Sequence, residues 1–187
     1  MAVKRRFPVR VATVYCNGGC RAKRKMEFQA NSCAEAQELC VGGPLECTYG
    51  CLGCGTCAQT CRFDAIQINL HGVAEVDESK CIGCGACVRK CPRDIIRIRL
   101  QGAWMVPLCS NRDKGFDPKT KSGARTVCDV SCIGCGLCVK NCPADAIQIV
   151  DFHAVVDEAK CLSCGACATV CPRHVIVDKQ GIITQAR

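Results

Sequence analysis

The clearest hydrophobic pattern in the chain is a short alternation of apolar and polar residues that returns several times. Residues 65–70, 94–100, 146–150 and 175–178 carry it. A period of two is typical of a short strand with one buried face. A turn at His71-Gly72 precedes a further apolar segment at residues 73–76, and residues 154–156 repeat it. The pattern therefore predicts small antiparallel pairings.

Only one segment indicates a helix by its end signals. Residues 30–40 read ANSCAEAQELC, with Ser32 in the position of an N-cap and Glu35 three residues later. A hydroxyl residue followed by glutamate at that spacing is the signature of a capped helix start. We expect a short helix here.

A dense cysteine run precedes each of the four alternating segments. Residues 81–92 read CIGCGACVRKCP, in the pattern C-x2-C-x2-C-x3-C-P. The same cysteine spacing occurs at Cys51, Cys54, Cys57 and Cys61, at Cys132, Cys135, Cys138 and Cys142, and at Cys161, Cys164, Cys167 and Cys171. This run is the bacterial signature for thiolate ligands of a [4Fe–4S] cluster. The sequence therefore predicts four such clusters.

The runs belong to an internal duplication. Cys51 recurs as Cys132 after 81 residues, and Cys81 recurs as Cys161 after 80. Flanking residues follow, since the DAIQI of residues 64–68 returns at residues 145–149. Each repeat holds two runs and resembles a bacterial two-cluster ferredoxin.

The predicted fold is α+β, with two tandem bacterial-type 2[4Fe–4S] ferredoxin-like units and a cysteine-rich N-terminal extension. The predicted boundaries are 1–46 for the cysteine-rich segment, 47–108 for the first unit, 109–127 for a basic linker and 128–187 for the second unit. The tail from residue 181 is expected to add a strand or to fray.

Two-cluster ferredoxins divide their cysteines across the runs, because the fourth cysteine of each run ligates the cluster of the other. Applied here, this rule predicts four ligand sets. They are Cys51, Cys54, Cys57 and Cys91; Cys81, Cys84, Cys87 and Cys61; Cys132, Cys135, Cys138 and Cys171; and Cys161, Cys164, Cys167 and Cys142.

Seven cysteines remain outside these sets: Cys16, Cys20, Cys33, Cys40, Cys47, Cys109 and Cys128. Three assignments stay open for the N-terminal group. They are a fifth cluster held by Cys16, Cys20, Cys33 and either Cys40 or Cys47, a mononuclear metal site, and unligated buried thiols. Cys109 and Cys128 are expected to be buried free thiols. Cys47 and Cys128 occupy equivalent places, each four residues before the first ligand of its unit.

Composition supports metal as the organising element. The chain has 23 cysteines in 187 residues but only 4% aromatic residues, so the usual bulky core side chains are scarce. A disulfide scaffold fits poorly, because the count is odd and no apolar leader follows the first charges. Structural zinc normally uses two separated C-x2-C pairs, which these runs do not resemble. Ligating thiolates indicate a reducing, cytoplasmic compartment.

The formal charge of +8 does not indicate nucleic-acid binding. Each oxidised cluster with four thiolates contributes about −2, so four clusters bring the total near zero. No aromatic platform or recognition-helix pattern is present, and no apolar run is long enough to span a membrane. The basic residues 4–6 and 112–125 are expected to be a solvated tail and loop, with docking to an acidic partner as the alternative.

No catalytic constellation is visible in the sequence. There is no phosphate-binding glycine loop, no nucleophile paired with a base and no dinucleotide fingerprint. His71 and His153 occupy comparable places in the two repeats and are predicted to be surface turn residues, and His174 stands apart from both. The residues therefore indicate electron transfer without substrate chemistry.

Several short motifs, in this order, resemble the B subunit of the Rnf electron-transport complex. They are CNGGC at 16–20, KMEF at 25–28, GGP at 42–44, CTYGCLG at 47–53, DKG at 113–115 and VSCIGC at 130–135. The resemblance implies a polyferredoxin subunit that passes low-potential electrons between a reduced carrier and the other subunits of an oxidoreductase complex. It also implies that the N-terminal cysteines serve an additional cluster.

The sequence departs from that family in several places. No N-terminal membrane anchor is seen, so the chain is expected to be cytoplasmic or peripheral to a membrane complex. Cys54 stands where many members have another residue, which makes Cys47 an alternative ligand of the first cluster. Arg62 replaces the proline after Cys61, and Ser163 replaces a glycine. The alternatives for function are a diffusing ferredoxin-type carrier and the electron-transfer subunit of a tungsten-pterin oxidoreductase.

Overall fold

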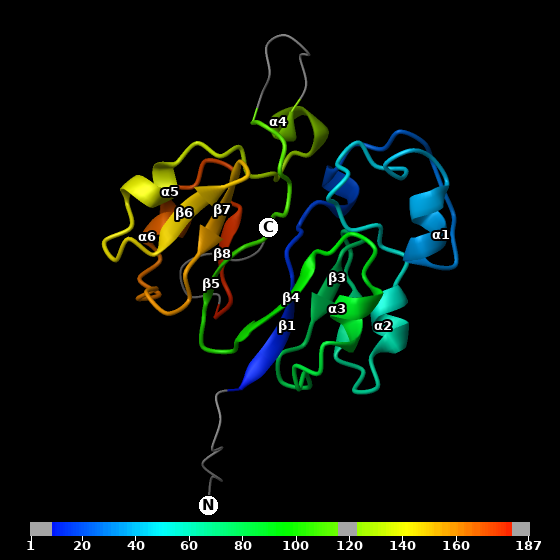
Figure 1. The fold of residues 1–187 in the computed structure, drawn as a ribbon, viewed down its shortest axis with the longest axis horizontal. Coiled ribbons are helices and arrows are strands. Elements are labelled where there is room, and N and C mark those ends of the chain that lie inside the picture. Colours follow the sequence, from blue (N-terminus) through cyan, green and yellow to red (C-terminus); the bar gives the residue numbers. More distant parts are fainter. Residues whose placement is uncertain (1–8, 116–122, 181–187) are drawn as a thin grey trace, which may run out of the picture.

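The computed structural model describes residues 9–115 and 123–180. Two lobes lie side by side in it (Figure 1). We call residues 9–101 the N-terminal lobe, and residues 103–115 with 123–180 the C-terminal lobe. In Figure 1 the first is coloured blue to green and the second green to red.

The N-terminal lobe contains two antiparallel strand pairs. Strand β1 (Arg10–Val14) pairs with β4 (Ile96–Leu100), and β2 (Ile66–Ile68) pairs with β3 (Ala74–Val76). The short helices α2 (Thr56–Thr60) and α3 (Ala86–Lys90) lie within the first two cysteine runs. Between β1 and the first run the chain forms a 3-10 turn, Gly19–Arg21, and helix α1, Cys33–Glu38.

The C-terminal lobe repeats this order. Strand β5 (Met105–Pro107) pairs with β8 (Ile176–Asp178), and β6 (Ile147–Val150) pairs with β7 (His153–Val156). Helices α5 (Leu137–Lys140) and α6 (Ala166–Thr169) lie within the third and fourth runs, and helix α4 (Ala124–Val127) precedes the third.

The strands predicted from alternation are confirmed, and so is the capped helix. The Ser32 side chain accepts a hydrogen bond from the Glu35 amide at 3.1 Å, and the Glu35 carboxylate accepts one from the Asn31 amide at 2.8 Å. These bonds satisfy amides that a helix start leaves without partners.

Strands β1 and β5 add to the predicted elements, and they change how the chain divides. Residues 1–46 supply β1 to the first lobe, while β5 precedes residue 108 yet pairs with β8 of the second. We therefore place the boundary between the lobes at residues 101–103, ahead of the predicted linker at 109–127. Residues 1–8, 116–122 and 181–187, which include the basic tail and part of the basic loop, lie outside the described residues.

Each lobe has its own small core, in which aliphatic residues surround cysteines. In the N-terminal lobe Val14, Ile95 and Ile96 pack with Cys51, Cys57 and Cys87. In the C-terminal lobe Met105, Val175 and Ile176 pack with Cys132, Cys138 and Cys167. Since so little apolar area is available, the space between the cysteines must be filled for these cores to be stable.

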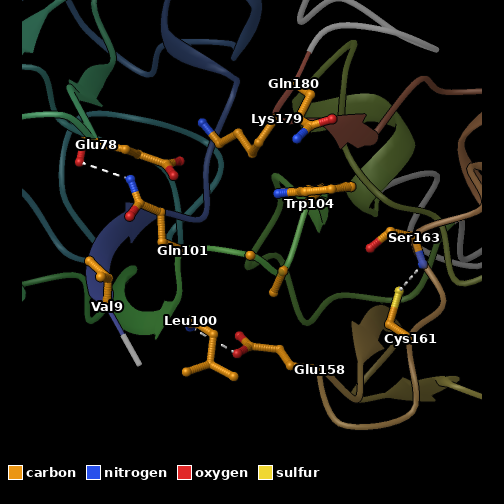
Figure 2. Close-up of a pocket in the computed structure, with 12 residues that line it drawn as sticks. Val9, Glu78, Leu100, Gln101, Trp104, Glu158, Cys161, Ser163, Lys179 and Gln180 are labelled. Atoms are coloured by element: carbon orange, nitrogen blue, oxygen red, sulfur yellow. Dashed lines mark hydrogen bonds between the residues drawn. The ribbon is translucent and has the colours of Figure 1, made fainter. Parts of the chain in front are cut away.

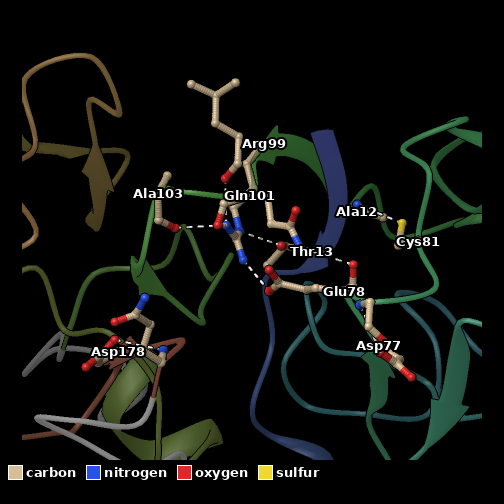
Figure 3. A network of polar contacts seen from close by, with 12 residues as sticks. Ala12, Thr13, Asp77, Glu78, Cys81, Arg99, Gln101, Ala103 and Asp178 are labelled. Atoms are coloured by element: carbon tan, nitrogen blue, oxygen red, sulfur yellow. Dashed lines mark hydrogen bonds and ion pairs between the residues drawn. The ribbon is translucent and has the colours of Figure 1, made fainter. Parts of the chain in front are cut away.

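A buried cation fixes the connection from β4 to β5. The Arg99 side chain donates to the Thr13 hydroxyl at 2.7 Å and to the carbonyls of Leu100 and Ala103 at 2.7 and 2.8 Å. It also pairs with the Glu78 carboxylate, as Figure 3 shows. A buried guanidinium is tolerated only when its donors are used in this way.

A pocket opens between the lobes at the ends of their edge strands. Figure 2 shows Glu78 and Gln101 on one side and Glu158, Cys161 and Ser163 on the other. The Glu158 carboxylate accepts a hydrogen bond from the Leu100 amide at 3.0 Å and so bridges the lobes. Within residues 9–115 and 123–180, no helix is long and apolar enough to cross a membrane.

Candidate iron–sulfur centres

The four cysteine runs share one local backbone conformation. The glycine before each short helix is left-handed, with φ of 77° at Gly55, 74° at Gly85, 75° at Gly136 and 79° at Gly165. A second left-handed residue stands three positions after the fourth cysteine of each run, at Asp64, Asp94, Asp145 and His174. Two such turns reverse the chain on either side of the helix, so each run curls around one point.

In the C-terminal lobe, one small apolar void is lined by four cysteines. Cys132, Cys135 and Cys138 come from the third run, and Cys171 comes from the end of the fourth. Apolar side chains, among them Ile176, complete the wall. This grouping matches the crossed set that the ferredoxin rule predicts.

In the equivalent void of the N-terminal lobe, a cysteine from outside the runs replaces the second cysteine of the run. Cys51, Cys57 and Cys91 line it together with Cys33, which opens helix α1. The Cys33 amide donates to the Thr56 hydroxyl at 2.8 Å, and this bond ties the start of α1 to the start of α2. Cys54 lies beside a neighbouring pocket instead. Burial and the nearby Cys33 thiolate raise the pKa of Cys54 to about 11.

Thiols of the fourth run lie close to those of the third. Burial, followed by the neighbouring thiolates of Cys161, Cys138 and Cys142, raises the pKa of Cys167 to about 12. The proximity of Cys142 to Cys167 again follows the crossed pattern. Backbone amides also reach the first sulfur of the second and fourth runs, from Ala12 to Cys81 at 3.3 Å and from Ser163 to Cys161 at 3.4 Å.

The chemistry of these centres fits iron–sulfur clusters. No two of the 23 cysteines are joined by a disulfide. No three His, Cys, Asp or Glu side chains among the described residues are close enough to hold one metal ion. One group of cysteines in each lobe instead lines a void, an arrangement that suits the ligands of a wider cluster. Burial raises the pKa of Cys51 to about 12 and of Cys57 and Cys138 to about 11, so a metal that binds these thiols would have to displace their protons.

The structure does not gather the N-terminal cysteines at one point. Cys33 faces the first void, Cys20 is exposed with its sulfur 3.7 Å from His71 Nδ1, and Cys40 is half-buried. Cys16 and Cys47 lie instead where the two lobes meet, close to Cys128 of the C-terminal lobe. Cys109 and Cys128 are buried, with 8% and 6% of their surface exposed.

The prediction that His153 is a surface turn residue is wrong. His153 begins β7 and has only 4% of its surface exposed, because it packs into a cavity lined by Tyr15, Arg97 and Glu158. Burial lowers its pKa. His71 is half-buried beside Cys20, and His174 is exposed.

Three family models match the chain, and each is described as a 4Fe–4S dicluster domain. They cover residues 47–98, 74–143 and 131–175. The chain is therefore an iron–sulfur protein with several 4Fe–4S dicluster ferredoxin domains.

Curated relatives narrow the class. The chain is 45% identical over 127 residues to the B subunit of the ion-translocating oxidoreductase complex of Methanosarcina acetivorans, an alignment that covers 68% of this chain and 46% of the relative. It is 40% identical over 151 residues to the B subunit of the proton-translocating ferredoxin:NAD(+) oxidoreductase complex of Clostridium ljungdahlii, with 80% of this chain and 51% of the relative covered. The Na(+)-translocating counterpart of Acetobacterium woodii is 41% identical, over 79% of this chain and 43% of the relative.

The resemblance to Rnf-type B subunits is thus confirmed. The chain spans about half the length of the curated relatives it matches. A solved chain from the formate dehydrogenase–heterodisulfide reductase–formylmethanofuran dehydrogenase complex of Methanospirillum hungatei aligns over 68% of this chain and 51% of its own length. The two chains are 22% identical, with a TM-score of 0.25.

Proposed function

We propose that this chain is a polyferredoxin subunit of an oxidoreductase complex and relays low-potential electrons through four [4Fe–4S] clusters. The observation that carries the proposal is the crossed grouping of Cys132, Cys135, Cys138 and Cys171 around one void. The two repeats, the shared conformation of the four runs and the dicluster family matches support it.

The proposed ligands are the four sets predicted from the sequence. When bound, the clusters supply one-electron chemistry, and the chain contributes thiolates, an apolar wall and amide donors to sulfur, which together set the reduction potentials. For the first cluster, Cys33 faces the same void as Cys51, Cys57 and Cys91, and stands next to the predicted ligand Cys54.

The proposed partners are the other subunits of the complex and a low-potential electron donor or acceptor. The names of the relatives, all B subunits of ion-translocating oxidoreductase complexes, support a place within such an assembly. The exposed cysteines Cys84, Cys135 and Cys164 support electron exchange at the surface, because they bring cluster ligands close to a docking partner.

Iron and acid-labile sulfide assays on anaerobically purified protein test the cofactor content. We expect at least about sixteen iron atoms per chain, four for each run. About eight would overturn the proposal. Size-exclusion chromatography of native extract tests the assembly, since a lone species of the chain's own 20.1 kDa would favour the diffusing carrier.

A further inference from the structure

Cys16 and Cys109 occupy equivalent positions in the two lobes. Cys16 follows β1 by two residues, and Cys109 follows β5 by two. The residue before each cysteine donates its amide to a carbonyl just ahead of the paired strand. Tyr15 donates to the Ile95 carbonyl before β4 at 2.7 Å, and Leu108 donates to the Val175 carbonyl before β8 at 2.9 Å. The sequence did not reveal this match, because the two cysteines are separated by a shift that differs from that of the runs.

The hydrogen bonds to the two sulfurs are equivalent as well. Cys16 Sγ accepts the amides of Gly18 at 3.4 Å and Cys51 at 3.3 Å. Cys109 Sγ accepts the amides of Asn111 at 3.5 Å and Cys132 at 3.3 Å. Each sulfur therefore lies against the first cysteine of the run in its own lobe.

Cys47 and Cys128 form a second equivalent pair. Both are buried. An arginine two residues after the last cysteine of a run, Cys91 or Cys171, holds the backbone at each of them. Arg93 donates to the Thr48 carbonyl, and Arg173 donates to the Cys128 carbonyl at 2.7 Å.

All four cysteines meet at the seam between the lobes. A Cβ atom added at Gly18 would lie 3.3 Å from Cys128 Sγ and 3.6 Å from Cys16 Sγ, so both sulfurs border the same glycine. Asn111 joins the other two, because its side-chain amide donates to Cys47 Sγ at 3.3 Å while its backbone amide donates to Cys109 Sγ. An isolated bridge between Ala22 and Cys128 holds the seam together.

The environment of these thiols resembles that of the predicted cluster ligands. Burial raises the pKa of Cys47, Cys109 and Cys128, and the nearby Cys16 thiolate raises each of them further. The hydrogen bonds described above direct N–H groups at Cys16, Cys47 and Cys109. Amide donors around thiolates in a dry site are the surroundings that stabilise a bound iron–sulfur cluster.

We propose that Cys16, Cys47, Cys109 and Cys128 bind a further [4Fe–4S] cluster at the seam between the lobes. This inference rests on the proposed iron–sulfur function and assigns ligands that differ from the N-terminal set expected from the sequence. A single zinc ion fits less well, because no three described side chains converge on one ion.

The position of the seam cluster gives it a function. Its ligands Cys16 and Cys109 accept hydrogen bonds from Cys51 and Cys132, which are ligands of the first cluster in each lobe. The seam cluster therefore lies between the two clusters proposed for the N-terminal lobe and the two proposed for the C-terminal lobe, and it connects them. It accepts one electron from one lobe and passes one to the other, and its charge changes between about −2 and −3 without any bond being made or broken.

Iron content of the full chain tests the proposal. Wild type is expected to hold about twenty iron atoms, and Cys109→Ala/Cys128→Ala about sixteen, because two thiols cannot hold the cluster. Cys20→Ala and Cys40→Ala are matched controls that remove cysteines outside the seam, and both should retain wild-type iron. Redox titration followed by EPR should show one fewer reducible cluster in the double variant.

The outcomes separate this proposal from the function on which it rests. Wild type near sixteen overturns the seam cluster but leaves the four-run function intact, whereas wild type near eight overturns both. Loss of about four iron atoms in Cys20→Ala, with none lost in the seam variant, would assign the extra cluster to the N-terminal set. If the double variant fails to fold, the wild-type iron count still decides whether a fifth cluster is present, and Cys20→Ala and Cys40→Ala decide whether the N-terminal set holds it.

Discussion

The two lobes build equivalent voids from different thiols. In the C-terminal lobe Cys135 lines the void, whereas in the N-terminal lobe Cys33 of α1 takes that place and Cys54 lies outside. The cause is the length of chain between equivalent points. From Cys16 to Cys51 the separation is 35 residues, and from Cys109 to Cys132 it is 23. The longer N-terminal segment forms α1 and brings an additional thiol, that of Cys33, to the void.

The comparison indicates that the cysteine-rich segment is built into the first lobe, because it supplies β1 to the strand pair and Cys33 to the wall of the void. Both lobes keep the same edge-strand pairing, the same left-handed turns and the same seam cysteines. What differs is which side chains line each void. The lobes are therefore expected to respond alike to loss of all metal and differently to single substitutions.

Removal of iron should have the largest effect, and it should affect both lobes. Treatment with a strong chelator under reducing conditions is expected to unfold the chain, because each core consists of aliphatic residues packed around cysteines. Far-UV circular dichroism and hydrogen exchange of the β4 and β8 amides measure this. Persistent protection of one strand pair after complete iron loss would mean that its lobe is stable without metal.

Cysteine substitutions should distinguish the lobes by iron content. Cys135→Ala is expected to lose about one to four iron atoms, because the four thiols that line its void are then reduced to three. Cys54→Ala should retain nearly all its iron, since Cys33 faces the equivalent void beside Cys54 and can replace it as a ligand. The double substitution Cys33→Ala/Cys54→Ala should then match Cys135→Ala. Equal losses in Cys54→Ala and Cys135→Ala would remove the difference between the lobes.

Arg99 and Lys179 test the comparison at the lobe connection. They occupy equivalent places at the ends of β4 and β8, and Arg99 is satisfied by several hydrogen bonds and by Glu78. Arg99→Met should lower the free energy of unfolding by about 3 kcal/mol, because it leaves a carboxylate and carbonyls without partners. Lys179→Met should change it by less than about 1 kcal/mol, since burial already disfavours the charged amine and lowers its pKa.

The denaturant concentration at which cluster absorbance is lost measures both variants. A control is Lys80→Met, because the pair of Lys80 with Asp77 at 3.6 Å is exposed and contributes little. Similar midpoints for Arg99→Met and Lys80→Met would contradict the assigned role of Arg99.

Local pattern was enough to predict part of this fold. The short strands after the four runs and the Ser32 cap are set by residues close together in the chain, and those elements are confirmed. The duplication also predicted that Cys47 and Cys128 are equivalent. Strand β1 was missed because VATV is a stretch without alternation, and its partner β4 lies more than eighty residues away.

Long-range packing decided the remainder. The place of Cys33 in the first void depends on where α1 docks, and the closeness of Cys16 to Cys109 depends on how the lobes associate. His153 was misplaced for the same reason, because the burial of this first residue of β7 depends on the neighbouring lobe that covers it. Spacing along the chain contains no information about such contacts.

The smallest expected effect concerns Ser163, which stands where the other three runs have glycine. Its φ is 53°, in the left-handed region that costs a residue with a side chain about 1–2 kcal/mol. Ser163→Gly should therefore stabilise the chain by about 0.5 kcal/mol, after the greater flexibility of glycine in the unfolded chain is subtracted. A small rise in the thermal midpoint of cluster loss measures this.

The reverse change at the equivalent position of the N-terminal lobe should not be neutral. Gly83 has φ of 70°, and a Cβ there would lie 2.5 Å from the Arg10 carbonyl oxygen of β1. Ser163 instead faces the pocket between the lobes, where a side chain has room. Gly83→Ser is expected to cost more than about 1 kcal/mol, because strand β1 must move away from the run. If both substitutions shift the midpoint by the same small amount, the strand contact does not explain why only one lobe tolerates serine.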